Sequence, residues 1–154
     1  MALNGLHAFL RRHSRIALDT SIFIYALEAH RKYAVLAEEV FEWLEKPGHA
    51  AVTSTITMTE LLVQPYRDED DERVDAFYSL LSTYPNLIWM PPDLGVADVA
   101  ARFRARYRLR TPDALQAATA VRSQATALVT NDPAFERVPE FATLVLDNVL
   151  DATS

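Results

Sequence analysis

Four acidic residues of this 154-residue chain stand where predicted strands end and predicted helices begin. Asp19 and Asp132 close strands, whereas Glu60 and Asp113 open helices. In a parallel sheet the carboxyl ends of the strands and the starts of the following helices share one edge, and ligands of open α/β proteins bind at that edge. We therefore expect these four carboxylates to converge.

The chemistry of such a cluster follows from its charge. Converging carboxylates repel one another, which raises some of their pKa values and destabilises the fold unless a cation lies between them. A set of oxygen ligands without histidine or cysteine suits Mg²⁺ or Mn²⁺ rather than zinc. One such ion, or a pair about 3.5 to 4 Å apart, activates water and stabilises phosphate charge during phosphodiester hydrolysis.

Each acid also has a structural alternative. Asp19 can cap the helix that follows it, and Glu60 can complete a capping box with Thr57. Asp113 suits the positive end of a helix dipole, and Asp132 is a common type of turn residue. The joint pattern favours a shared site, because four separate structural roles do not require that all the acids meet at one edge.

Predicted strands and helices alternate along the chain. Short apolar runs predict strands at 16–18, 50–53, 87–90, 125–130 and 143–146. Amphipathic periodicity predicts helices at 22–27, 33–46, 58–64, 74–84, 94–107 and 113–124, the third of them ended by Pro65 and the last capped by Thr111. This alternation predicts an α/β fold, a three-layer α/β/α sandwich around a parallel sheet, in a single domain over residues 15–150. Residues 1–14 are an N-terminal extension with the spacing of a short helix.

Composition narrows the class of protein. The absence of cysteine excludes disulfides, thiol nucleophiles and cysteine-ligated zinc, and is compatible with a reducing cytoplasm. No stretch has the pattern of a secretory signal or the length of a membrane span, so we expect a cytoplasmic protein with no membrane partner. The net charge of −6 argues against a protein that coats nucleic acid, but not against a nuclease whose carboxylates hold metal.

The segments that carry the four acids resemble the ordered motifs of PIN domains, especially those of VapC-type toxins from bacterial type II toxin–antitoxin pairs. These segments are residues 16–21, 57–62, 111–120 and 128–135. The resemblance spans about residues 15–148 and implies the strand order 3-2-1-4-5. It also implies an endoribonuclease that needs Mg²⁺ or Mn²⁺, cleaves RNA and is inhibited by a cognate antitoxin. The N-terminal extension departs from the early first strand that is usual in the family.

The same resemblance assigns roles to individual residues and suggests a homodimer. Asp19, Glu60, Asp113 and Asp132 would form the catalytic metal site, with Asp19 and Asp113 as the direct ligands and Asp132 acting through water. Four neighbouring polar residues would orient carboxylates, water or phosphate; these are Thr20, Ser21, Thr130 and Asn131.

A row of arginines precedes Asp113. On one continuous helix Arg102, Arg106 and Arg110 would share a face, which could guide RNA phosphates towards the acids. The alternative is a solvated helix face that balances acids elsewhere in the chain.

Two other functions fit parts of the pattern. A phosphatase of the haloacid-dehalogenase type also has an Asp after its first strand, but it usually has a second acid two residues later, where this chain has Ser21. A non-catalytic receiver-like or RNA-binding module would share the fold, although an idle carboxylate cluster would cost it stability. The chain lacks a glycine-rich phosphate loop, which argues against an NTPase or a dinucleotide enzyme.

Overall fold

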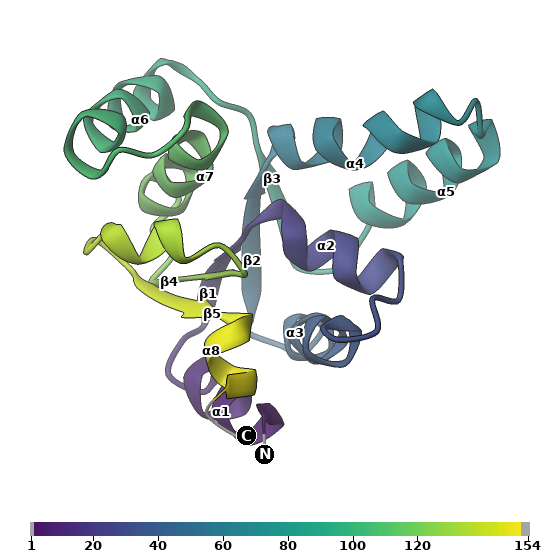
Figure 1. Ribbon diagram of the computed structural model, residues 1–154, viewed down its shortest axis with the longest axis horizontal. Coiled ribbons are helices and arrows are strands. Elements are labelled where there is room, and N and C mark those ends of the chain that lie inside the picture. Colours follow the sequence, from purple (N-terminus) through teal and green to yellow (C-terminus); the bar gives the residue numbers. More distant parts are fainter. Residues whose placement is uncertain (1, 152–154) are drawn as a thin grey trace.

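The computed structural model describes residues 2–151, so Met1 of the predicted extension lies outside the described residues. A five-stranded parallel sheet forms its centre (Figure 1). The strands are β1 (Arg15–Leu18), β2 (Ala50–Ser54), β3 (Leu87–Met90), β4 (Ala127–Thr130) and β5 (Ala142–Val145). Their order is β3-β2-β1-β4-β5, and every neighbouring pair is parallel. The predicted fold class and strand order are confirmed.

Helices cover both faces of this sheet. Successive side chains of β1 enter opposite cores, since Ile16 and Leu18 pack in one cluster and Ala17 in the other. The first cluster lies under α1 (Ala2–Leu10), α2 (Thr20–Leu27), α3 (Ala34–Leu44) and α8 (Leu146–Asp151). The second lies under α6 (Leu94–Tyr107) and α7 (Thr111–Arg122). Burial on both faces explains why the central strand β1 is apolar without alternation from Ile16 to Leu18.

Helices α4 (Thr55–Arg67) and α5 (Asp71–Ser82) form a hairpin at one side of the sheet (Figure 1). Helix α4 continues through Pro65, so the helix end predicted there is wrong. Pro65 lies in the last turn of the helix, where its missing N–H removes a single backbone hydrogen bond. Its ring is buried, and this burial helps to offset that loss.

Two short elements were not predicted. A 3₁₀-helix, η1 (Pro133–Arg137), follows β4, and α8 follows β5 where only a tail was expected. Helix α8 packs against α1, and a Cβ atom at Gly5 of α1 would lie 3.4 Å from Val149 Cγ1. Helices as short as these form through tertiary contacts rather than through their own periodicity. None of the described helices is long and apolar enough to cross a membrane.

Candidate active site

The four predicted acids all lie near the carboxyl edge of the sheet. Asp19 follows β1 as the N-cap of α2, and Asp132 follows β4 as the N-cap of η1. Asp113 lies in the first turn of α7, and Glu60 lies in the second turn of α4, which follows β2. Because β2, β1 and β4 are adjacent parallel strands, the helices that follow them start at one edge. Helix α7 starts at the same edge, because it runs back to the beginning of β4.

Electrostatics shows that the acids act on one another. Burial raises the pKa of Asp19, and the negative charges of Asp113 and Glu60 raise it further. Burial also raises the pKa of Asp113, and the charge of Asp132 adds to that effect. Each of the four carboxylates therefore lies within the field of another member of the set.

Hydroxyl groups hold Asp19 in place. Thr130 Oγ1 donates a 2.6 Å hydrogen bond to Asp19 Oδ2, and Ser21 Oγ donates to the same oxygen at 3.3 Å. The bond from Thr130 favours the ionised carboxylate and lowers the pKa of Asp19, against the larger effect of burial. The side chain of Asp19 makes no capping hydrogen bond to α2, although the backbone N–H of Thr20 also lowers the pKa of this carboxyl.

Glu60 is held by Thr20 rather than by its own helix. The capping-box alternative with Thr57 is wrong, because α4 begins at Thr55 and its N-cap is Ser54, whose Oγ accepts from the Ile56 amide. Thr20 Oγ1 instead donates a 3.1 Å hydrogen bond to Glu60 Oε1. Glu60 is therefore linked to the residue that directly follows Asp19.

Asp113 pairs with Arg110. Arg110 Nε donates to Asp113 Oδ2 at 3.4 Å, and this pair lowers the pKa of Asp113 against the effect of burial. The side chain of Asp113 is 15% exposed and that of Arg110 is 81% exposed, so the guanidinium group remains largely in solvent.

The prediction that Arg102, Arg106 and Arg110 share one helix face is wrong for Arg110. Helix α6 ends at Tyr107, and Arg108 then adopts a left-handed conformation with φ 57°. Arg110 is consequently the N-cap of α7, replacing the predicted cap Thr111, and it does not continue the face of Arg102 and Arg106. Both of those arginines lie exposed on α6.

A buried amide that sequence reasoning missed connects three elements around the site. Gln116, on α7, is 4% exposed. Its Nε2 donates to Thr57 Oγ1 at 2.8 Å and to Thr20 Oγ1 at 3.4 Å, and its Oε1 accepts from the Ser54 amide at 3.4 Å. The one signal in the sequence was a glutamine between the small residues that α7 packs against the sheet. The network aligns Thr20, and through it Glu60.

Asp132 and Asn131 have structural contacts of their own. Asp132 Oδ1 accepts from the Ala134 amide at 2.9 Å, so the turn role expected as an alternative is present. Its backbone N–H donates to Thr130 Oγ1 at 3.0 Å. Asn131 bonds to the Tyr25 hydroxyl and to the Asp147 amide, and not to any of the four acids.

The donor chemistry of the site fits a hard cation, because the four acids offer only oxygen ligands. Within the described part of the chain, no group of three or more His, Cys, Asp or Glu side chains is arranged as it stands to hold a metal ion. Mutual repulsion and the separate pairing of Asp113 with Arg110 oppose closer approach of the carboxylates. A divalent cation would offset that repulsion.

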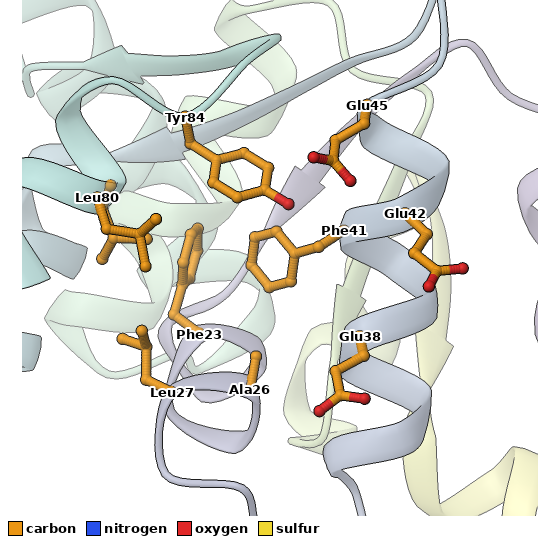
Figure 2. A pocket seen from close by; sticks show the side chains of 10 residues that line it. Phe23, Ala26, Leu27, Glu38, Phe41, Glu42, Glu45, Leu80 and Tyr84 are labelled. Atoms are coloured by element: carbon orange, nitrogen blue, oxygen red, sulfur yellow. The ribbon is translucent and has the colours of Figure 1, made fainter.

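A separate groove of about 350 Å³ lies between α2, α3 and α5 (Figure 2). Its floor is apolar and includes Phe23 and Phe41, whose rings meet edge to face with centroids 5.4 Å apart. Three glutamates line the α3 wall, as Figure 2 shows: Glu38, Glu42 and Glu45. The groove therefore combines an apolar floor with an acidic margin.

With this fold and this placement of acids, the chain belongs to the PIN domain family, whose model matches residues 16–141. Comparison with curated protein sequences finds no match.

Solved structures share the fold. VapBC-1 from nontypeable Haemophilus influenzae has a TM-score of 0.67 at 22% identity, covering 86% of this chain and 98% of that chain. VapBC2 from Rickettsia felis, bound to a DNA fragment from its promoter, has a TM-score of 0.65 at 21% identity, covering 85% and 98%. VapC20 from Mycobacterium tuberculosis, described as a sarcin–ricin loop cleaving toxin, has a TM-score of 0.57 at 20% identity, covering 73% and 86%. The predicted resemblance to the PIN domains of VapC toxins is confirmed.

Proposed function

We propose that this chain is a metal-dependent endoribonuclease and the toxin of a toxin–antitoxin pair. The observation that carries the proposal is the placement of Asp19, Glu60, Asp113 and Asp132 at the starts of helices along the carboxyl edge of a PIN fold. The neighbour described as a sarcin–ricin loop cleaving toxin supports RNA as the substrate class.

Asp19 and Asp113 would hold Mg²⁺ or Mn²⁺, with Glu60 and Asp132 completing the oxygen-rich surroundings. When bound, such an ion supplies Lewis-acid stabilisation of phosphate charge and an activated water for phosphodiester hydrolysis. Residues of the chain itself influence the ionisation of the carboxylates that would bind the metal. Thr130 favours the ionised form of Asp19, because its hydrogen bond lowers the pKa of that carboxyl.

The surrounding residues position the acids and the RNA. Gln116 fixes Thr20, which in turn donates to Glu60. The exposed guanidinium of Arg110 lies beside Asp113 and can contact a phosphate of the bound strand. Arg102 and Arg106 would attract the RNA backbone further along α6, an interaction that salt weakens.

The partner protein would bind in the groove of Figure 2. The neighbours from Haemophilus and Rickettsia are VapBC structures, which supports an antitoxin partner for this chain. A segment that fits this groove needs apolar side chains for the floor around Phe23 and Phe41. It also needs arginine or lysine opposite the glutamates of α3.

A homodimer and a cytoplasmic location complete the proposal. Apolar side chains of α4 remain accessible, with Tyr66 60% and Val63 37% exposed, and a second copy could cover them. An RNA substrate and a chain without cysteine both suit the reducing cytoplasm.

The two competing functions have less support. A haloacid-dehalogenase-type phosphatase would need an acid at position 21, and Ser21 there donates its hydroxyl to Asp19. A receiver-like module has no need of Glu60 beside Asp19, yet the charge of Glu60 acts on that carboxyl. Acylphosphate formation on Asp19 would favour either alternative.

The deciding experiment measures cleavage of labelled bacterial RNA and of a sarcin–ricin loop oligonucleotide by the purified protein. We expect cleavage with Mn²⁺ or Mg²⁺, none with a chelator, and none with Asp113→Asn. Asp75→Asn, on the exposed side of α5, is the matched control. Cleavage that persists with the chelator or in Asp113→Asn would overturn the metal mechanism, and intact RNA under all conditions would overturn the nuclease.

A further inference from the structure

Tyr25 lies beside the acidic site, although no motif of the sequence singles it out. It is in the second turn of α2, and its hydroxyl oxygen accepts a 3.1 Å hydrogen bond from Asn131 Nδ2. Asn131 stands between Thr130 and Asp132, which are bonded to each other and, through Thr130, to Asp19. The phenol therefore lies at the rim of the carboxylate cluster.

A closed set of contacts holds this phenol. The rings of Tyr25 and Tyr33 lie with centroids 4.5 Å apart. The Tyr33 hydroxyl donates to Asp147 Oδ1 at 2.5 Å, and the Asp147 amide donates to Asn131 Oδ1 at 2.9 Å. Asn131 closes the set by donating to Tyr25. Three residues, from the α2–α3 connection, the turn after β4 and the start of α8, thus hold the Tyr25 hydroxyl in position.

The hydroxyl groups of Tyr25 and Tyr33 differ in their hydrogen bonds. The Tyr33 hydroxyl uses its proton on Asp147, so its donor is occupied. The Tyr25 oxygen accepts from Asn131, and within residues 2–151 its own proton has no acceptor. Burial, together with the charges of Tyr33, Asp147 and Asp19, raises the pKa of Tyr25 against the opposing hydrogen bond, so the phenol keeps its proton at neutral pH.

A neutral donor at this place has a chemical use. When ionised, the acids at the centre of the site are acceptors only, and a phosphodiester strand also presents acceptor oxygens. Binding the strand next to the carboxylates therefore requires donors on the rim. Arg110 supplies a charged donor beside Asp113 at the α7 side, and Tyr25 supplies a neutral one at the β4 side.

We propose that Tyr25 donates its phenolic hydrogen bond to a phosphate oxygen of the RNA strand next to the scissile bond. Asn131 is then a positioning residue that acts through Tyr25, rather than a group that orients the carboxylates. This inference rests on the proposed function, because it takes RNA as the substrate.

The test compares wild type, Tyr25→Phe and the matched control Tyr78→Phe, which removes a hydroxyl from an exposed tyrosine of α5. Affinity for a fluorescein-labelled single-stranded RNA of randomised sequence is measured with a chelator present. Cleavage is measured separately with Mn²⁺, and thermal unfolding checks the fold. Hydrogen bonds to charged groups are worth about 1.5–3 kcal/mol, so we expect Tyr25→Phe to lose about tenfold or more in affinity and in kcat/KM. Tyr78→Phe should match wild type.

Asn131→Ala provides the second arm. If Asn131 acts through Tyr25, its loss should lower kcat/KM in the wild-type background and have little further effect in Tyr25→Phe. Full additivity would overturn the positioning role of Asn131.

The outcomes separate this inference from the proposed function. If wild type cleaves RNA and Tyr25→Phe binds and cleaves it equally well, the proposed Tyr25 contact is overturned and the proposed nuclease activity is retained. Wild type that binds RNA in a Tyr25-dependent manner without cleaving it keeps the contact and overturns the nuclease. Wild type that neither binds nor cleaves RNA overturns both.

Discussion

Thr130 Oγ1 donates a 2.6 Å hydrogen bond to Asp19 Oδ2, across 111 positions of sequence. Thr130 Oγ1 also accepts a 3.0 Å hydrogen bond from the backbone N–H of Asp132. One hydroxyl at the end of β4 therefore ties the acid that follows β1 to the acid that follows β4. The arrangement depends on β1 and β4 being parallel neighbours in the sheet.

Thr130→Val should shift the pH dependence of cleavage. The hydrogen bond from Thr130 lowers the pKa of Asp19, so its removal lets burial raise that pKa further. Because metal binding needs the ionised carboxylate, the acid limb of the rate profile should move to higher pH. Thr130→Ser keeps a hydroxyl and should restore the wild-type profile. An acid limb that is identical in all three proteins would show that Thr130 does not control Asp19.

Asp19→Asn should stabilise the protein at neutral pH in the presence of a chelator. The folded-state pKa of Asp19 is raised above its unfolded value, so its stabilising effect is present at low pH and is lost as the pH rises through the folded pKa. At neutral pH the ionised, buried carboxylate of Asp19 therefore destabilises the folded state, and asparagine, which does not ionise, avoids this loss of stability. We expect a melting temperature a few degrees above wild type at pH 7, with a difference that shrinks as the pH falls through the folded-state pKa and is gone below about pH 4. A less stable variant at pH 7 would favour the structural role of Asp19.

Mg²⁺ or Mn²⁺ should raise the melting temperature of the wild type. A ligand that binds only the folded state stabilises it by about 2.7 kcal/mol at a hundred times its dissociation constant. Asp19→Asn and Asp113→Asn should lose this response, whereas Asp75→Asn, outside the site, should keep it. Equal metal-induced shifts in all four proteins would place the cation elsewhere.

The sheet was predictable because its physical signal is local. Runs such as Ile16–Leu18 are apolar throughout since both of their faces are buried, and each is followed by a helix. The places of Asp19 and Asp113 at strand and helix ends follow from the same pattern. The prediction was wrong at Pro65 and at Arg110, where burial of a proline and a left-handed residue after α6 decided the helix boundaries.

The supporting contacts of the site were not predictable in the same way. Gln116 meets Thr57 across 59 positions, and Asn131 meets Tyr25 across 106. Neither pair has a sequence spacing that indicates contact, because the packing of separate elements brings them together. Position at strand ends and helix starts indicated which acids could bind a cation, and the family resemblance named hydroxyl residues near them. Only the fold shows that Thr20 contacts Glu60 whereas Ser21 and Thr130 contact Asp19.

Gln116→Met should destabilise the protein by about 1–3 kcal/mol, since it keeps the size of the side chain and leaves buried polar partners unpaired. The lost bonds are those to Thr57, to Thr20 and from the Ser54 amide. Urea unfolding measures the change. The control Gln64→Met alters an exposed glutamine of α4 and should change the free energy of unfolding by about 0.5 kcal/mol or less. Equal effects of the two substitutions would show that the buried network contributes little.

The acidic groove should select peptides by charge. Glu38, Glu42 and Glu45 are spaced four and three residues apart, which places them along one side of α3. We expect a helical peptide with leucines on one face and arginines along its flank to bind more tightly than the same peptide with glutamates in place of the arginines. Each exposed pair is worth about 0.2–1 kcal/mol, so the preference should be several-fold to about a hundredfold and should weaken in high salt. Replacing the three groove glutamates with glutamine should remove the preference, whereas Glu72→Gln on α5 should retain it. If the preference persists after the triple substitution, the groove recognises the apolar side chains of the peptide and not its charge.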